Sequence, residues 1–298
     1  MNDKSKCMSP VAVGGVGGSG TRVVAEILIQ LGFYMGNDLN AAYDNLWFTL
    51  LFKRPDWFFK NLNSRESQIF KGINIFENTM TGTLSSKYNE LIFIMKAAVE
   101  MMFKGQDHLG SGKGLWPLKR VLTMIQSKKR YSFKDIGWGW KEPNTHIYIE
   151  YLSRYFDNLK YIHVIRHGLD MAYSSNQAQL YNWGIMFGVE ANNLSTPLPI
   201  LSLKYWNEAN KRAVALGKKL FNERFLVINF EKLCINPEDE ISLLMDFLKI
   251  DKKKLDINEL AKLPKLPKSA GRYKNYDLTI FSKNEIDTVR DLGFEVDK

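Results

Sequence analysis

A glycine-rich segment near the N-terminus is the part of the sequence best suited to chemistry. The run Gly14–Gly20 separates an apolar stretch, Val11–Val13, from a helix-like one, Val23–Leu31. Glycines let the backbone turn tightly enough for successive N–H groups to converge. The first N–H groups of a helix and the positive end of its dipole point to the same place. A strand, a glycine loop and a helix start therefore predict a cradle for a phosphate group.

Three interpretations of this loop have to be compared. A Walker A loop places Lys and then Ser or Thr after its last glycine, whereas Thr21 and Arg22 follow Gly20 here, which argues against an ATP-dependent kinase or ATPase. The pattern G-x-G-x-x-G fits residues 15–20, but a dinucleotide fold also requires an acid ending a second strand, and Asp38 lies in a turn-like stretch. A glycine-rich turn without a ligand is the third interpretation.

A second segment adds another phosphate-binding pattern. Lys160–Ile165 is typical of a buried strand and runs directly into Arg166. We expect a helix over residues 168–178, with Ser174 about two turns into it on the side that faces back toward Arg166. An arginine at a strand end and a serine on the next helix predict a clamp for a further phosphate.

Together the two segments resemble the sulfotransferase family, whose donor is 3′-phosphoadenosine 5′-phosphosulfate (PAPS). The family has a 5′-phosphosulfate loop containing Ser-Gly-Thr and a 3′-phosphate motif R-x-x-x-D-x-x-x-S. In this chain the first motif corresponds to Ser19–Thr21, and the second to Arg166, Asp170 and Ser174. The resemblance implies that the donor is bound by Gly17, Gly18, Ser19, Gly20, Thr21, Arg22, Arg166 and Ser174.

The resemblance continues toward the C-terminus. Phe225–Leu233 and Leu243–Leu248 are similar to the last core strand of the family and the helix that follows it. Lys268–Lys274 is similar to a basic, glycine-containing loop that folds over the 3′-phosphate, and the resemblance implies that Gly271 and Arg272 also bind the donor. Residues 40 to 130 match no family pattern.

One departure from the family concerns the catalytic cation. Many members carry a lysine or arginine directly before Ser-Gly-Thr, where it stabilises charge on the leaving group, and this chain has Gly18 there. Arg22 opens the following helix and is one replacement, although a salt-bridged surface arginine would give the same sequence. Lys141, after the short aromatic strand expected at residues 136–140, is the other.

The general base is also not given by the family pattern. Cytosolic members place a histidine two residues after the equivalent of Lys141, and Pro143 stands there instead. Glu142 is the first candidate, His146 the second and an acid from the unplaced region the third. Glu142 is equally consistent with an acid favoured by the dipole at a helix N-terminus.

Composition indicates a compact soluble enzyme. The 298 residues are 45% hydrophobic, with a mean hydropathy of −0.25, which suffices for one large domain with a sizeable core. The 41 Lys and Arg against 32 Asp and Glu give a net charge of +9, which attracts anionic ligands in general. Because the basic residues are spread along the chain, we expect no nucleic-acid partner. Cys7 and Cys234 fit no metal-ligand spacing, and we expect no metal.

The N-terminal residues bear on location. Met1–Pro10 is polar and runs directly into the first strand, so we expect neither a signal peptide nor a membrane anchor. Golgi sulfotransferases carry such an anchor. The sequence therefore predicts a cytoplasmic protein, of bacterial type.

Strands alternating with helices predict an α/β fold: a parallel sheet with helices on both faces, as in the P-loop-like sulfotransferases, in one domain over residues 1–298. A helical insertion over about 42–130 is rich in aromatic residues, and we expect it to form the acceptor site. The expected elements are strands at 11–13, 136–140, 160–165 and 225–229, and helices at 21–31, 145–156, 168–178, 203–221 and 237–249, with a C-terminal loop and helix. Thr21, Lys141 and Arg166 all follow strands, so we place them at one sheet edge.

The function that follows is transfer of a sulfuryl group from PAPS to a hydroxyl or amine of a small-molecule or glycan acceptor, leaving adenosine 3′,5′-bisphosphate (PAP). Lys141 and Arg22 would neutralise the leaving group and Glu142 would take the acceptor proton. The alternatives are a nucleotide-binding pseudoenzyme, suggested by Gly18, and a P-loop-like small-molecule kinase. The sequence does not specify the acceptor or the oligomeric state.

Overall fold

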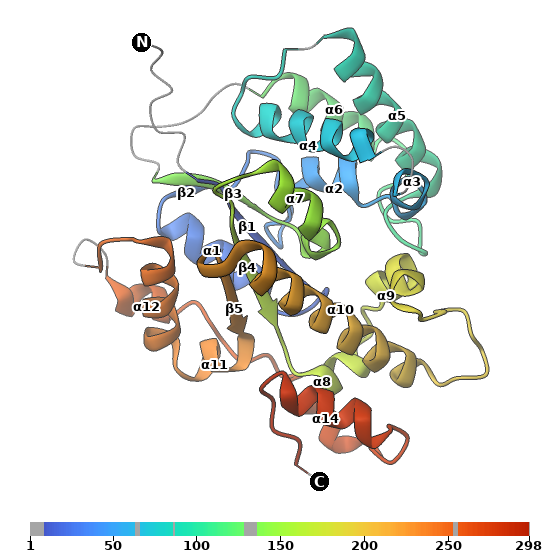
Figure 1. Ribbon diagram of the computed structural model, residues 1–298, viewed down its shortest axis with the longest axis vertical. Helices are drawn as coiled ribbons and strands as arrows, with labels where there is room; N and C mark the ends of the chain where they lie inside the picture. The colour runs from blue at the N-terminus through green and yellow to red at the C-terminus, as the bar shows by residue number, and fades with distance from the viewer. Residues whose placement is uncertain (1–8, 63–65, 86, 128–135, 253–255, 298) are drawn as a thin grey trace.

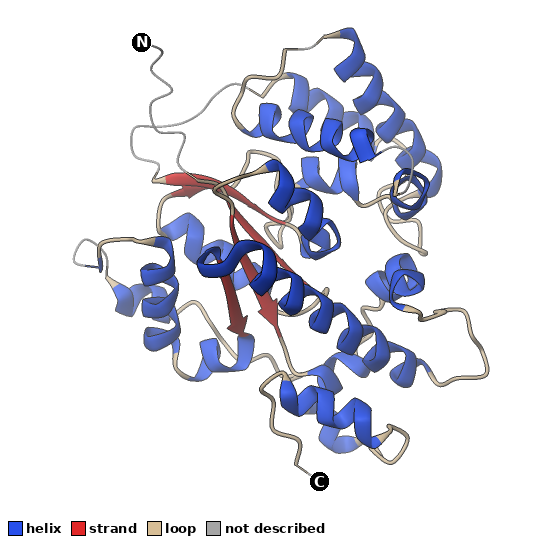
Figure 2. Cartoon of the chain, viewed as in Figure 1, coloured by secondary structure: helices blue, strands red, loops and turns tan. Residues whose placement is uncertain are grey.

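A five-stranded parallel sheet forms the centre of the computed structural model, which describes residues 9–62, 66–85, 87–127, 136–252 and 256–297. Helices cover both faces of the sheet (Figure 1 and Figure 2). The strand order is β2-β3-β1-β4-β5. The strands are β1 (Val11–Gly15), β2 (Phe33–Tyr34), β3 (Gly137–Lys141), β4 (Lys160–Ile165) and β5 (Phe225–Asn229). The predicted α/β class is confirmed.

The helices fall into an N-terminal, a middle and a C-terminal group. The first contains α1 (Thr21–Gln30), α2 (Leu46–Phe52), α3 (Pro55–Asn61), α4 (Glu66–Met80), α5 (Tyr88–Lys104) and α6 (Trp116–Ile125). The second contains α7 (Ile149–Tyr155), α8 (Gly168–Ala172), α9 (Ala178–Trp183) and α10 (Leu198–Phe221). The third contains α11 (Phe230–Ile235), α12 (Pro237–Leu248), α13 (Ile257–Ala261) and α14 (Lys283–Asp291).

The two faces of the sheet pack into separate hydrophobic clusters because side chains alternate along a strand. Val13 and Ile162 point into a cluster formed with α1 and α12. Ala12 and Tyr161, their neighbours in the chain, point into a larger cluster that includes α10 and the aromatic residues of the insertion. Both faces are therefore buried, as the apolar character of β1 and β4 predicts.

The insertion is helical, as predicted, and runs from α2 to α6 beyond one end of the sheet (Figure 1). Its aromatic residues join it to β3: the Trp140 ring lies 5.2 Å from that of Phe76 and 5.9 Å from that of Phe48. Most of the aromatic side chains are therefore core. The expected end of the insertion, near residue 130, lies outside the described residues. In the described part of the chain no helix is long and apolar enough to span a membrane.

The helix expected over 145–156 is divided. Its first part is a 3-10 helix, η1 (Pro143–Tyr148), and only the second part, α7, is α-helical. The Thr145 side chain and backbone N–H both donate to the Glu142 carbonyl, at 2.7 and 3.0 Å, which closes the tighter i→i+3 turn. The short elements β2, α9, α11 and α13 were not expected from the sequence.

The helix expected over 168–178 is wrong beyond its first turns. Helix α8 ends at Ala172, so Ser174 lies in the loop before α9 and not two turns into a helix. The Gln177 amide donates to the Met171 and Ser174 carbonyls, and Arg272 donates to the Tyr173 carbonyl. These side chains thus hydrogen-bond the carbonyls that would accept from backbone N–H groups if the helix continued. Helix propensity within the segment does not predict these contacts.

Candidate active site

The glycine loop connects β1 to α1 with a tight backbone turn. Gly18 and Gly20 have left-handed φ angles of +92° and +88°. Ser19 is fully buried, and both its Oγ and its N–H donate to the Val16 carbonyl, at 2.5 and 3.0 Å. Thr21 begins α1, so the loop ends where the helix presents its unpaired N–H groups and positive dipole. The predicted strand, loop and helix start are confirmed.

Gly20 is required by a close approach as well as by its φ angle. A Cβ atom there would lie 2.0 Å from Cδ2 of Phe230. We expect Gly20→Ala to lower the free energy of unfolding by about 3 kcal/mol or more, measured by denaturant unfolding. Gly293→Ala is the matched control, because Gly293 also has a φ of +92° but nothing within 4 Å of the added Cβ. Equal losses in the two variants would contradict the packing argument.

The same geometry bears on the missing lysine of the loop. At Gly18 a side chain would start from a left-handed backbone and meet Cε of Met171 at 3.0 Å. The loop conformation of this chain therefore disfavours a side chain at the position where many family members carry their cation.

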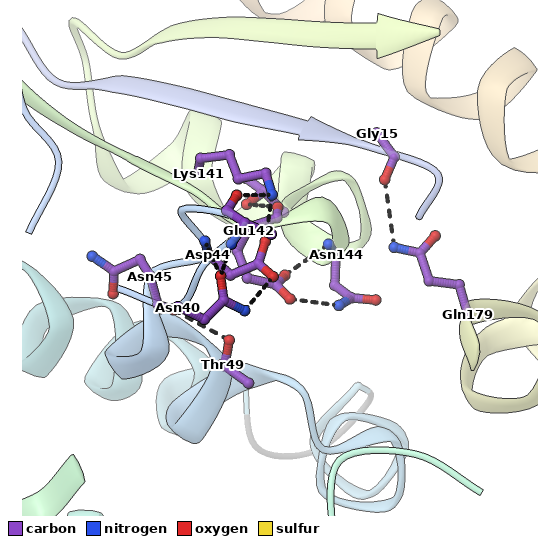
Figure 3. Close-up of polar contacts among 11 residues, drawn as sticks. Gly15, Asn40, Asp44, Asn45, Thr49, Lys141, Glu142, Asn144 and Gln179 are labelled. Atoms are coloured by element: carbon purple, nitrogen blue, oxygen red, sulfur yellow. Dashed lines mark hydrogen bonds and ion pairs between the residues drawn. The ribbon is translucent and has the colours of Figure 1, made fainter. Parts of the chain in front are cut away.

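Lys141 ends β3 and is paired with the start of the insertion. Its Nζ donates to Oδ1 of Asp44 at 2.6 Å and to the Ala42 carbonyl at 2.9 Å (Figure 3). The lysine side chain is 3% exposed, against 21% for Asp44. The structure thus confirms that the sheet fixes Lys141 at its carboxyl edge, and it adds a carboxylate partner that the sequence did not identify.

Glu142 is buried, at 3% exposure, and is hydrogen-bonded to Asn144. Its two carboxylate oxygens accept from the backbone N–H and the side-chain amide of Asn144, at 2.7 and 2.8 Å. Trp183 holds that amide in place through its Nε1, at 2.9 Å from Oδ1 of Asn144. Burial, with the charge of Asp44 adding to it, raises the pKa of Glu142 to about 7. Glu142 thus caps η1, as expected from the alternative interpretation of this residue as an acid at a helix N-terminus.

His146 lies beneath the glycine loop, fully buried. Its Nε2 lies 3.4 Å from Oε1 of Gln179, and Gln179 also donates to the Gly15 carbonyl and accepts from the Tyr205 hydroxyl. Burial lowers the pKa of His146 to about 3, so the ring is neutral at physiological pH. Through its contact with Gln179, His146 supports the glycine loop.

Arg166 follows β4 directly and joins the two ends of the chain. One guanidinium nitrogen donates to the Gly18 carbonyl at 3.3 Å and another to the Ser269 hydroxyl at 2.9 Å. The guanidinium lies over the Phe230 ring, and its Nε is 3.9 Å from Glu231. The arginine is therefore at the glycine loop, as predicted.

The basic C-terminal loop is held beside Arg166 by Asp170. The two oxygens of this buried carboxylate accept from the N–H groups of Gly271 and Tyr273, at 2.7 and 3.1 Å. Arg272 donates to the Tyr173 carbonyl at 3.1 Å and lies close enough to Arg166 for its charge to act on it. The carboxylate of the R-x-x-x-D-x-x-x-S motif thus fixes the loop, whereas Ser174 Oγ accepts from the N–H of Asn176.

Arg22 lies at the start of α1 with its side chain exposed. Its guanidinium is 5.9 Å from the centre of the Tyr43 ring. Tyr43 precedes Asp44, so Arg22 and Lys141 approach the same turn of the chain from α1 and β3. The predicted grouping of the residues after β1, β3 and β4 at one sheet edge is confirmed.

Asp44 and Gln179 are the two residues of this edge that the sequence analysis missed. Asp44 lies in the region without a family pattern, and its only signal was the general expectation of an acid there. Gln179 lies on α9, beyond the end of the helix expected over 168–178, in a stretch where no element was expected.

Comparisons with known proteins show what the chain is similar to. A model of the sulfotransferase family matches residues 10–254. Two of the similar solved structures are the sulfotransferase domain of the Synechococcus PCC 7002 olefin synthase (15% identity, TM-score 0.49, 99% of this chain and 98% of that one) and the sulfotransferase domain of the curacin biosynthetic pathway (14%, 0.48, 98% and 100%). A third is sulfotransferase STF9 of Mycobacterium avium (15%, 0.47, 98% and 78%). A search of curated proteins found no match.

Because the family model spans most of its length, the chain belongs to the sulfotransferase family. It is an enzyme of the transferase class, with an α/β P-loop-like fold.

Proposed function

We propose that this sulfotransferase takes the sulfuryl group from PAPS and transfers it by in-line displacement to a hydroxyl or amine of a small-molecule or glycan acceptor. The observation that carries the proposal is the convergence of two guanidinium groups, Arg166 and Arg272, next to the glycine loop. Burial lowers the pKa of Arg166, and the charge of Arg272 acts in the same direction. A multiply charged phosphate between them would relieve this repulsion.

The glycine loop supplies the second anion site of the proposal. The N–H groups at the start of α1 would hold the 5′-phosphate, with Gly17, Gly18, Ser19, Gly20 and Thr21 as its lining. Lys141 and Arg22 would neutralise the charge that develops on the bridging oxygen as sulfur leaves it. Arg166, Gly271 and Arg272 would hold the 3′-phosphate, and Ser174 would approach it from the loop after α8.

The insertion is the proposed acceptor region within a single domain. A cavity of about 460 Å³ lies between α3, α5, the loop after α5 and α9, with Phe59 and Tyr181 in its wall. The charge of Lys53 acts both on Asp107 in this wall and on Glu142. Lys53 thus lies between the cavity wall and Glu142, which supports the cavity as the place of an acceptor.

The choice of donor is tested by ligand-induced stabilisation. PAP should raise the thermal unfolding temperature far more than ATP or NAD at equal concentration, because a ligand that binds only the folded state stabilises it by mass action. Differential scanning fluorimetry measures all three shifts on one preparation. Equal shifts with ATP and PAP would contradict the proposed donor.

A further inference from the structure

The turn before α2 is built to hold a carboxylate against β3. In this turn Oδ1 of Asn40 accepts from the N–H groups of Ala42 and Asp44, both at 2.9 Å. The Asn40 amide donates to Oδ2 of Asp44 at 2.8 Å. The N–H of Asn45 donates to the Lys141 carbonyl at 2.8 Å, which fixes the turn to the strand end (Figure 3). Asp44 is thus held by Asn40, through its N–H and its carboxylate, and by the bond between the next residue, Asn45, and β3.

The turn also contains an unfavourable backbone conformation. Tyr43 has a φ of +60°, in the left-handed region that costs a non-glycine residue of this size about 1 to 2 kcal/mol. This conformation lets the Tyr43 ring lie under Arg22 while the next residue, Asp44, contacts Lys141. Strain of this kind occurs where a side chain has to be held in one place for function.

The two carboxylates beside Lys141 differ in access. Glu142 is 3% exposed, and both its oxygens accept from Asn144. The Asp44 side chain is 21% exposed and, among the described residues, accepts one hydrogen bond on each oxygen, from Lys141 on Oδ1 and from Asn40 on Oδ2. Since each carboxylate oxygen has two lone pairs, Asp44 can accept one more proton donor from the open side.

Lys141 has one N–H group left to donate. Its ammonium has three N–H groups, of which two are directed to Asp44 and to the Ala42 carbonyl. Among the described residues the third has no hydrogen-bond partner, so it is available to the bridging oxygen of PAPS as the leaving group develops. One lysine can therefore contact the leaving group and the carboxylate at the same time.

We propose that Asp44 is the general base of the sulfuryl transfer, acting beside Lys141 at the edge of the sheet. The inference rests on the proposed function. The acceptor oxygen forms the new S–O bond, and its proton passes to the Asp44 carboxylate. The bond between sulfur and the bridging oxygen breaks, and its electron pair stays on that oxygen, so PAP leaves. As Lys141 turns its charge toward the leaving oxygen, it stabilises the Asp44 carboxylate less, which makes Asp44 a stronger base at that moment.

In this arrangement Glu142 is a positioning residue. Through Asn144 it fixes the start of η1 and the end of β3, and it does not contact the acceptor. The two carboxylates therefore have different roles. Each role can be tested by an isosteric substitution, Asp44→Asn or Glu142→Gln.

The test compares Asp44→Asn with the unmodified enzyme, using labelled PAPS and two acceptor probes. At about pH 8, 4-nitrophenol is largely ionised and needs no base, whereas phenol is protonated and does. We expect Asp44→Asn to lower kcat with phenol by about 10²-fold or more and kcat with 4-nitrophenol by less than about 10-fold. The dissociation constant of PAP should change by less than about 3-fold. Asp246→Asn removes a matched surface aspartate, paired with Lys252, and should leave both rates unchanged.

Equal losses with both phenols would overturn the proposal and make Asp44 a positioning residue for Lys141. A selective loss of phenol turnover in Glu142→Gln instead would overturn it in favour of Glu142. If the unmodified enzyme neither binds PAP nor transfers the label, the proposed function fails and the inference with it. Binding and transfer in that enzyme, with an unaffected Asp44→Asn, would overturn the inference alone.

Asp44→Asn leaves the buried Lys141 charge without its carboxylate and can prevent folding. In that case Lys141→Met is compared with Lys141→Met/Asp44→Asn. The double variant should show a phenol to 4-nitrophenol rate ratio about 10-fold or more below that of Lys141→Met. Equal ratios in these two proteins would overturn the proposal.

Discussion

Lys141→Ala is expected to lower kcat by about 10²-fold or more while the dissociation constant of the donor stays nearly unchanged, because a charge contact made as the leaving group develops acts only in the transition state. The sheet fixes Lys141 at the end of β3, and its contacts in the ground state are to Asp44 and Ala42. We therefore expect its ammonium to act mainly in the transition state and little in donor binding.

Arg22→Ala is the matched comparison and should show the reverse: weaker donor binding and a kcat at saturation closer to that of the unmodified enzyme. Arg22 is exposed on α1, the helix whose first N–H groups are proposed to hold the 5′-phosphate. Saturation kinetics with phenol and a binding isotherm for PAP give both constants for each variant. If Lys141→Ala weakens donor binding and leaves kcat unchanged, the roles are exchanged and Arg22 is the leading catalytic cation.

Arg166→Ala is expected to remove most of the preference for PAP over ATP. A charge-assisted hydrogen bond to a phosphate contributes about 1.5 to 3 kcal/mol, so PAP should bind about 10- to 150-fold more weakly. Isothermal titration with PAP and ATP measures the ratio of the two affinities directly.

The control for Arg166→Ala is Arg290→Ala, which removes a surface arginine paired with Asp287 on α14. It should leave the affinity ratio unchanged. The Arg166 variant also loses the bond to Ser269, so circular dichroism has to show that the variant is folded. An unchanged ratio in folded Arg166→Ala would place the 3′-phosphate elsewhere.

The elements that bring Arg22, Lys141 and Arg166 together could be predicted from the sequence because their signals are local. One apolar run ends at the glycine loop and another at Arg166, and both indicate the end of a strand. Parallel strands place these ends at one edge of the sheet. The family resemblance supplied the order of the segments, and the match over residues 10–254 confirms the family.

The rest of the site depends on contacts between distant segments. Asp44 meets Lys141 across 97 positions of sequence, and Asp170 meets Gly271 across 101. The early end of α8, which moves Ser174 off the helix, depends on Gln177 and on Arg272 from the C-terminal loop. No periodicity or propensity within one segment records such contacts, so the contact of Asp44 with Lys141 and the position of Ser174 could not be derived locally.

Transfer of the sulfuryl group is the most direct test of the proposed function. The purified protein is incubated with sulfur-labelled PAPS and a panel of glycans, phenols and lipids, and the products are identified by mass spectrometry. We expect one labelled sulfuryl group on an acceptor, with one PAP released for each transfer and none in the absence of protein. Failure to label any acceptor, combined with phosphoryl transfer from ATP to a member of the same panel, would contradict a PAPS-dependent sulfotransferase.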